Sequence, residues 1–258
     1  MLRPLPLLMA ALLGAASAAS VQLNLPGRQD RAWLLCDSLS TPEVLVVGQP
    51  DAGGRAEITT LSKAQPGRYS YAAWRVGRPD PGAGNVYYSL TPRDGSAASS
   101  TSPDNIRLIN PGVAANPQLY SASGVPVLSS ITLQGQTRRC RLAPGLRVLA
   151  VTERRSVMIT QDAQGRFRYQ SFDNAAFRPG DVQTTLGDSL AQSSTPSLSI
   201  VGGTRLISPA GERYTFTHQG YTYTLSLQSS GGSLSVQRGS TPLQSEPLRA
   251  VLTGDRPG

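Results

Sequence analysis

Short segments in which apolar and polar side chains alternate constrain the fold of this chain more than any other feature. The clearest is residues 221–228, YTYTLSLQ, where every second side chain is aromatic or aliphatic. Successive side chains of a β-strand point to opposite faces, so such a segment buries one face and leaves the other in water. No apolar repeat with the 3.6-residue period of a helix continues over three turns. The chain is therefore predicted to be all-β.

The predicted strands are short and follow one another closely. They are Val21–Leu25, Ala32–Cys36, Glu43–Val47, Ala56–Leu61, Tyr69–Val76, Val86–Leu90, Ile106–Ile109, Ile131–Leu133, Leu146–Val151, Val157–Ile159, Phe167–Phe172, Leu198–Val201, Arg205–Ile207, Tyr214–Phe216, Tyr221–Leu227, Leu234–Val236 and Arg249–Leu252. The 26 Gly and 20 Pro are spread along the chain, as expected where many strands are joined by turns. Burying so many amphipathic strands predicts an antiparallel β-sandwich or two stacked β-sandwich-like modules.

The expected organisation has four parts. Residues 1–18 form a cleaved signal peptide, and residues 19–173 form an N-terminal β domain with a central meander. Residues 174–197 carry almost no hydrophobic pattern and are predicted to be a linker or long loop. Residues 198–258 form a C-terminal β-meander. Whether this meander packs on the first domain or forms a second one is left open.

The first residues have the composition of a secretion signal. Arg3 gives the positive start, residues 5–16 give the apolar core, and Ala16-Ser17-Ala18 gives a small-x-small cleavage site. The apolar run is shorter than the roughly 20 residues that a membrane-spanning helix needs, and no later run is longer. No Cys follows the core, which argues against a lipoprotein. The chain is predicted to be exported to the periplasm, the cell envelope or the medium, without a transmembrane segment in its mature form.

Cys36 and Cys140 are the two cysteines of the chain. In an exported protein an even and minimal count of cysteines predicts a disulfide. Two alternatives remain. The cysteines could be separate buried thiols, or Cys140 could be a reactive thiolate whose pKa is lowered by the flanking Arg138, Arg139 and Arg141.

Arginine carries almost all of the positive charge. Lys63 is the single lysine among 24 basic residues, and removal of Arg3 with the signal leaves 23 basic against 16 acidic residues, a net charge of +7. One predicted meander holds eight arginines, opposed only by Glu153 and Asp162. The eight are Arg138, Arg139, Arg141, Arg147, Arg154, Arg155, Arg166 and Arg168. Because outward side chains of neighbouring strands lie side by side, they are predicted to form one cationic face. A codon bias towards arginine and an ordinary solvated surface are the alternatives.

A cationic face of this kind suits an anionic partner, because guanidinium groups bind carboxylate and phosphate in bidentate fashion. Outside the cytoplasm, the expected partner is an anionic envelope polymer or an acidic protein. No nucleic-acid-binding motif accompanies the charge, which argues against a nucleic-acid partner. The oligomeric state is left open.

Residues 187–190, Gly-Asp-Ser-Leu, resemble the tetrapeptide of the GDSL lipase and esterase family. The resemblance ends there, because His218, the only histidine, has no Asp shortly before it, and no helices alternate with strands to build the family's parallel sheet. His218 is instead expected at a strand end. One His and two Cys cannot form a zinc site, and the scattered acids contain no calcium-binding loop. The sequence therefore predicts neither metal nor cofactor.

Two further functional classes stay open. A carboxylate-dependent glycan hydrolase is compatible with export and a β fold, and it would draw on acids in or beside loops. These acids are Asp80, Asp94, Asp104 and Glu153. An inhibitor of a secreted enzyme would instead present a protruding loop such as residues 78–85 or 93–105.

The aromatic residues add one weak candidate site. Tyr69, Tyr71, Trp74 and Tyr88 are expected to pack in the core, as aromatic residues of strands usually do. Tyr87 has the opposite parity from Tyr88 and is expected to be exposed, where its ring could stack on a sugar. Together these observations predict an exported, non-catalytic binding or structural module of the cell envelope that acts through its arginine face.

Overall fold

The structure, a computed structural model, describes residues 19–82, 84–93, 103–109, 127–178 and 195–254. Within these residues the chain forms nineteen β-strands and one short 3-10 helix, η2 (Asn174–Ala176). The strands are β1 (Ser20–Leu25), β2 (Arg28–Asp37), β3 (Glu43–Gly48), β4 (Arg55–Ser62), β5 (Tyr69–Pro81), β6 (Asn85–Pro92), β7 (Asn105–Ile109), β8 (Leu128–Leu133), β9 (Gln136–Arg139), β10 (Leu146–Val151), β11 (Arg155–Gln161), β12 (Phe167–Asp173), β13 (Leu198–Val201), β14 (Gly203–Ser208), β15 (Gly211–His218), β16 (Tyr221–Gln228), β17 (Gly231–Arg238), β18 (Thr241–Pro247) and β19 (Ala250–Thr253). The predicted signal peptide, the tetrapeptide 187–190 and Asp94 lie outside the described residues.

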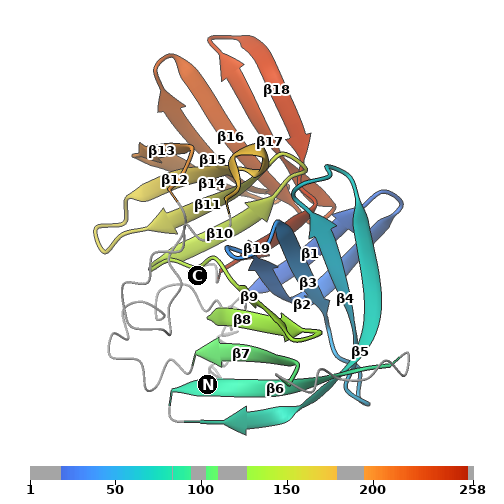
Figure 1. The fold of residues 1–258 in the computed structure, drawn as a ribbon. Coiled ribbons are helices and arrows are strands. Elements are labelled where there is room, and N and C mark those ends of the chain that lie inside the picture. Colours follow the sequence, from blue (N-terminus) through green and yellow to red (C-terminus); the bar gives the residue numbers. More distant parts are fainter. Residues whose placement is uncertain (1–18, 83, 94–102, 110–126, 179–194, 255–258) are drawn as a thin grey trace, which may run out of the picture.

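The strands form two antiparallel sheets, neither of which closes into a barrel (Figure 1). The larger sheet has fourteen strands in the order β13-β12-β11-β10-β19-β1-β2-β3-β4-β5-β6-β7-β8-β9, and the smaller has the order β14-β15-β16-β17-β18. The all-β prediction is thereby confirmed. Within the described ranges, no helix is long and apolar enough to cross a membrane.

The N-terminal half of the large sheet, β2 to β9, curls so that its two ends meet. The disulfide Cys36–Cys140 joins them with a Cα–Cα distance of 4.8 Å, which confirms the predicted pairing. Two backbone hydrogen bonds flank the disulfide: Leu39 N donates to Arg139 O at 2.8 Å, and Arg141 N donates to Asp37 O at 2.9 Å. A buried core fills the inside of the curl. It contains Leu34, Val47, Ile58, Trp74, Leu90, Ile106 and Ile131.

The central meander, β10 to β12, is buried on both faces. Leu149 and Met158 pack into a core shared with β1 to β4, whereas the alternate residues Val148 and Ile159 pack against the smaller sheet. The sequences LRVLAV and SVMIT carry near-continuous apolar runs, which is the pattern of strands covered on both sides. The meander is therefore the middle layer of the molecule and presents no open sheet face.

The smaller sheet is an insertion between two strands of the large one. β13 and β19 both pair in the large sheet, and the chain between them builds β14 to β18. The change of sheet occurs at two glycines: Gly202 has φ +82°, and a Cβ on Gly203 would lie 2.4 Å from the ring of Phe216. The domain division predicted at residues 174–197 stays a prediction, but the pairing of strands does not follow it.

One loop predicted from sequence is largely strand. Residues 78–85 were considered above as a protruding loop, yet β5 runs on to Pro81 and β6 begins at Asn85. The pairing of β4 with β5 ends at the Arg55–Arg75 pair, so β5 has only one partner beyond that point. Proline has no backbone N–H to donate to a neighbouring strand. On the side of β5 that has no partner strand this donor is not needed, which explains why Pro79 and Pro81 fit there.

Candidate functional site

Of the eight arginines of the predicted cationic face, five lie at or near the ends of the meander strands, two lie on β9, and Arg141 lies between β9 and β10. Arg154 lies in the turn between β10 and β11, and Arg155 is the first residue of β11. Arg147 and Arg166 lie at the opposite end, where Arg147 Nε donates to Gln161 Oε1 at 2.9 Å. The six residues of β10 separate these ends by about 20 Å, at about 3.3 Å per residue. The meander arginines are therefore divided between two ends of one layer.

Three of the eight are engaged in ion pairs with little exposure. Arg141 is buried and its Nε lies 2.5 Å from Asp37 Oδ2. Arg138 Nε lies 2.9 Å from Glu43 Oε2 with 11% of its side chain exposed. Arg155 Nε lies 3.3 Å from Glu246 Oε1. These guanidinium groups stabilise buried or half-buried carboxylates and are not presented to a partner.

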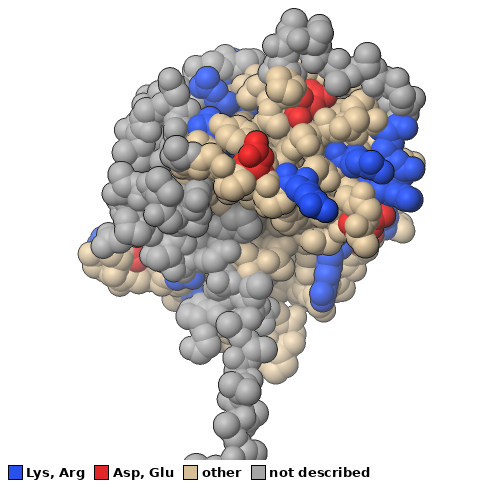
Figure 2. Space-filling model, turned by 90° about the horizontal axis from the view of Figure 1, so that it is seen from below, with Lys and Arg blue, Asp and Glu red and all other residues tan. Residues whose placement is uncertain are grey.

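Four arginines of the set are exposed: Arg139, Arg154, Arg166 and Arg168. Arg166 lies 2.8 Å from Asp162, and Arg139 is on β9, the last strand at the far edge of the large sheet. On the side of the molecule seen in Figure 2, some basic side chains lie next to one another in one group, and others lie apart from it. The prediction of a single face on the meander therefore receives no support from this arrangement.

A different arginine cluster forms on the face that β2, β4 and β5 turn away from the inside of the curl. Arg55 of β4 stands opposite Arg75 of β5. Two residues further along the pair Glu57 stands opposite Ala73, and four residues further along Thr59 stands opposite Tyr71. Arg28 of β2 reaches this face, since its Nη2 lies 2.7 Å from Glu57 Oε1. We name Arg28, Arg55, Tyr71 and Arg75 the Arg–Tyr face.

Tyr71 is the most exposed large aromatic side chain among the described residues, with 63% of its surface accessible. The guanidinium carbon of Arg28 lies 5.9 Å from the centre of its ring, within the range of a cation–π contact. Tyr69, on the same face, is 39% exposed. The prediction that these two tyrosines pack in the core was wrong, whereas Trp74 is buried as expected.

Charges on this face are only partly compensated. Arg28 pairs with Asp30 as well as Glu57, and the hydrogen bond to Glu57 is the main reason that the pKa of Arg28 is raised. Arg55 lies 3.8 Å from Asp51. Among the described residues, Arg75 and the neighbouring Arg31 form no ion pair with an acid. The face therefore holds fixed guanidinium groups with free hydrogen-bonding capacity beside an exposed ring.

A shallow groove of about 250 Å³ runs along one side of the face. Arg28, Arg31 and Arg55 line it together with Asp30, Glu57 and residues of β1 and β3. Groups from four strands meet here, although they are spread over residues 23 to 59 of the chain. A groove with arginines along it and an aromatic ring beside it can hold an extended acidic chain.

The other sequence candidates occupy separate places. Tyr87 is half-buried under Arg107, whose guanidinium carbon lies 6.0 Å from the ring centre. His218 is half-buried at the end of β15, opposite Tyr221. Neither residue lies on an open aromatic or catalytic surface of the described chain.

The candidate catalytic acids do not form a described cluster. Asp104 is buried and its Oδ1 accepts the backbone N–H of Gly135 at 3.0 Å. Glu153 pairs with Arg249, and Asp80 is exposed near the end of β5. Among the described residues, no group of three or more Asp, Glu, His or Cys side chains could hold a metal ion. The acids for which partners are seen act as structural partners.

The sequence did contain a signal for the Arg–Tyr face. In residues 69–76 the side chains of Tyr69, Tyr71 and Arg75 share one parity, and Trp74 and Val76 share the other. Alternate side chains of a strand point to opposite faces, so only one of these two sets can face the core. The set that contains Arg75 was the one to expect on the solvent side. The cross-strand neighbours Arg28 and Arg55 could not be found this way, because register between strands is not visible in one sequence.

No protein-family model, curated protein or solved structure matches this chain. The site is therefore interpreted from its own chemistry.

Proposed function

We propose that this protein is an exported, non-catalytic binding module of the cell envelope that holds an acidic polysaccharide on the Arg–Tyr face. The observation that carries the proposal is the register of β4 and β5, which sets Arg55 beside Arg75 with Tyr71 further along the same face. Arginine pairs with sugar carboxylates in bidentate fashion. An exposed tyrosine offers a flat apolar surface with a polar tip to a sugar ring.

Export is part of the proposal and rests on the N-terminal sequence. A β-sheet face suits this role because its side chains are fixed at regular spacing, about 4.8 Å between strands. Arg28 is already held over Tyr71 by its carboxylate partners. A polymer binding here would therefore order few side chains, which keeps the entropic cost of binding low.

The test compares two double variants with the same change in charge. Arg55→Ser with Arg75→Ser removes two arginines of the Arg–Tyr face, and Arg154→Ser with Arg168→Ser removes two exposed arginines at the ends of the meander. Affinity for polygalacturonate, an acidic glycan, is measured at several salt concentrations, with neutral dextran as the negative probe. We expect the first variant to bind at least tenfold more weakly and to show a smaller salt dependence. The second variant should bind like the unmodified protein.

Tyr71→Ala separates stacking from charge. We expect it to weaken binding to polygalacturonate while leaving the salt dependence unchanged, because it removes no charge. Equal losses in the two arginine double variants would instead mean that only net charge matters, and the proposal would then be wrong. Undiminished binding after loss of Arg55 and Arg75 would also refute it.

A further inference from the structure

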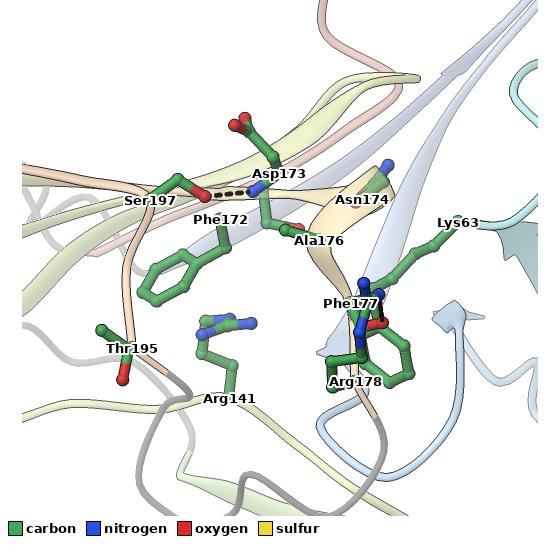
Figure 3. Close-up of a pocket in the computed structure, with 11 residues that line it drawn as sticks. Lys63, Arg141, Phe172, Asp173, Asn174, Ala176, Phe177, Arg178, Thr195 and Ser197 are labelled. Atoms are coloured by element: carbon green, nitrogen blue, oxygen red, sulfur yellow. Dashed lines mark hydrogen bonds between the residues drawn. The ribbon is translucent and has the colours of Figure 1, made fainter.

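The two buried basic side chains of the described residues both have a partner inside the molecule. Lys63 and Arg141 line the small cavity drawn in Figure 3. Both pair with the carboxylate of Asp37, which is fully buried. Backbone groups without a partner strand lie instead on the outside of the molecule, along the free edges of the two sheets.

A sheet edge presents backbone N–H and C=O groups that pair with no neighbouring strand, and folded proteins usually protect it. The edge strands are β13 and β9 in the large sheet and β14 and β18 in the smaller one. The end of β9 is joined to the end of β2 by the disulfide and by an isolated bridge between Ser38 and Cys140. β18 carries Pro242 and Pro247, which have no N–H, and a bulge at Leu243. These features leave neither β9 nor β18 open to a long added strand.

The other two edge strands are consecutive along the chain. β13 and β14 occupy residues 198–208, LSIVGGTRLIS, a stretch with no proline and one charged residue, Arg205. Six large hydrophobic side chains are exposed among the described residues, and three of them lie here: Val201 (53%), Leu206 (60%) and Ile207 (49%). No described strand pairs with the outer side of β14. This edge is therefore unprotected and apolar, which is typical of a site where another chain adds a strand.

The β14 edge carries no net charge, although the chain as a whole has a net charge of +8. Arg205 pairs with Glu212 of the neighbouring β15, and the two side chains are only 13% and 5% exposed. The guanidinium group is thus neutralised within its own chain. A neutral, apolar edge attracts neither an acidic nor a basic segment. It fits a partner edge of the same character, and two identical edges can meet there without repulsion between their charges.

The alternation of side chains in β14 selects one register for such a pairing. Thr204, Leu206 and Ser208 share one face of the strand. Arg205 and Ile207 share the other face. Residues directly opposite each other in an antiparallel pair lie on the same face, so two copies related by a two-fold axis must pair residues from the same set. With Leu206 at the axis, the two leucines lie opposite each other and Arg205 lies opposite Ile207. With Arg205 at the axis, two guanidinium groups would lie opposite each other, which is unfavourable.

We propose that β14 docks a second copy of this chain, in an antiparallel pair whose two-fold axis passes through Leu206. The pair joins two five-stranded sheets into one continuous sheet and gives the backbone groups of both edges a partner. The two Leu206 side chains cover each other, at the roughly 4.5–5.5 Å spacing between Cβ atoms of directly opposed residues. The proposal uses no residue of the Arg–Tyr face, so it does not depend on the proposed function.

Sedimentation equilibrium over a wide range of protein concentration measures the association directly, and we expect a monomer–dimer equilibrium. Leu206→Lys places a charge on the edge and should raise the dissociation constant of the dimer at least about tenfold, because the leucines of both copies lose their contact. Leu243→Lys makes the same change at a side chain of similar exposure, 55%, on β18, and should leave the equilibrium unchanged. Circular dichroism checks that both variants keep the fold. A protein that stays monomeric at every concentration, or equal effects of the two variants, would overturn the proposal.

A cysteine at the axis tests the register. Cys36 and Cys140 are the only cysteines of the chain and are joined to each other, so Leu206→Cys supplies the single free thiol. Directly opposed residues of an antiparallel pair have Cα atoms about 4.5–5.5 Å apart, a distance that a disulfide can span. We expect mild oxidation to link two copies of Leu206→Cys on a non-reducing gel, whereas Leu243→Cys should remain unlinked. Equal linkage of the two variants would show that chance collisions, and not the β14 pair, bring the thiols together.

Discussion

The buried cluster of Asp37, Lys63 and Arg141 makes a prediction that depends on the sign of the charge removed. Asp37→Asn leaves two buried cations without their shared carboxylate, and breaking a buried ion pair in this way costs about 3–5 kcal/mol of unfolding free energy. Lys63→Met leaves the carboxylate of Asp37 paired with Arg141, whose Nε lies 2.5 Å from Asp37 Oδ2. Because Met fills a similar volume without charge, we expect this second variant to lie within about 1 kcal/mol of the unmodified protein.

Thermal and urea unfolding of the oxidised protein measure both variants. For a chain of this size, 1 kcal/mol corresponds to about 2–4 °C, so Asp37→Asn should lower the melting temperature by roughly 10 °C. Lys63→Met should change it by only a few degrees. If Lys63→Met were as damaging as Asp37→Asn, removing one cation would cost as much as removing the shared carboxylate, and the reasoning would be wrong.

Three other predictions test the fold. Replacing Cys36 and Cys140 by Ser should cost about 4–5 kcal/mol in the chain-entropy model, measured as a lower urea midpoint, because the disulfide closes a loop with a sequence separation of 104 residues; an unchanged midpoint would contradict this. The pKa of Asp37 is lowered from 3.8 to about 2, so about 2 kcal/mol of stability should be present above pH 4 and lost as the pH falls towards 2, and an acid titration followed by circular dichroism should lose this step in Asp37→Asn. Leu149→Ala should destabilise by about 2–5 kcal/mol, as expected for a fully buried leucine, and a cost below 1 kcal/mol would mean that the meander is open on one side.

Local pattern predicted the elements well and their neighbours poorly. The strictly alternating segment 221–228 is β16, and the predicted strands Val157–Ile159 and Phe167–Phe172 lie within β11 and β12. The pairing of Cys36 with Cys140 followed from the count of cysteines and the expected compartment. These features depend on short stretches of chain or on the chemistry of the residues themselves.

The arrangement of layers could not be read from the same pattern. The meander was predicted to carry its arginines on one outward face, because outward side chains of neighbouring strands lie side by side. The neighbouring runs of β10 and β11 are apolar at nearly every position, which favours burial on both sides. What covers the second face is the sheet β14 to β18, and the packing between them depends on contacts that no local segment encodes. The arginines of the meander were therefore displaced to strand ends and turns.

The Arg–Tyr face as a whole could not be predicted from the sequence either, because it is formed by residues of different strands. Its arginines are isolated in the sequence, so charge clustering along the chain pointed elsewhere. Arg28 and Arg75 are brought to one surface only because β2, β3, β4 and β5 follow one another in antiparallel order with a register that puts Arg55 opposite Arg75. A search for charge along a β chain therefore finds turns and strand ends, whereas a functional surface of a sheet is assembled across strands.

The topology also explains why so much chemistry is concentrated at one junction. The curl from β2 to β9 must bring Asp37 and Arg141 together, and the sheet order places β19 between β10 and β1, so two closures join segments distant in sequence. Contacts of such long range are entropically costly to form. At the first closure the disulfide lies directly next to the ion pair, since Cys36 precedes Asp37 and Cys140 precedes Arg141. A covalent link and an ionic link thus hold the same two strand ends together.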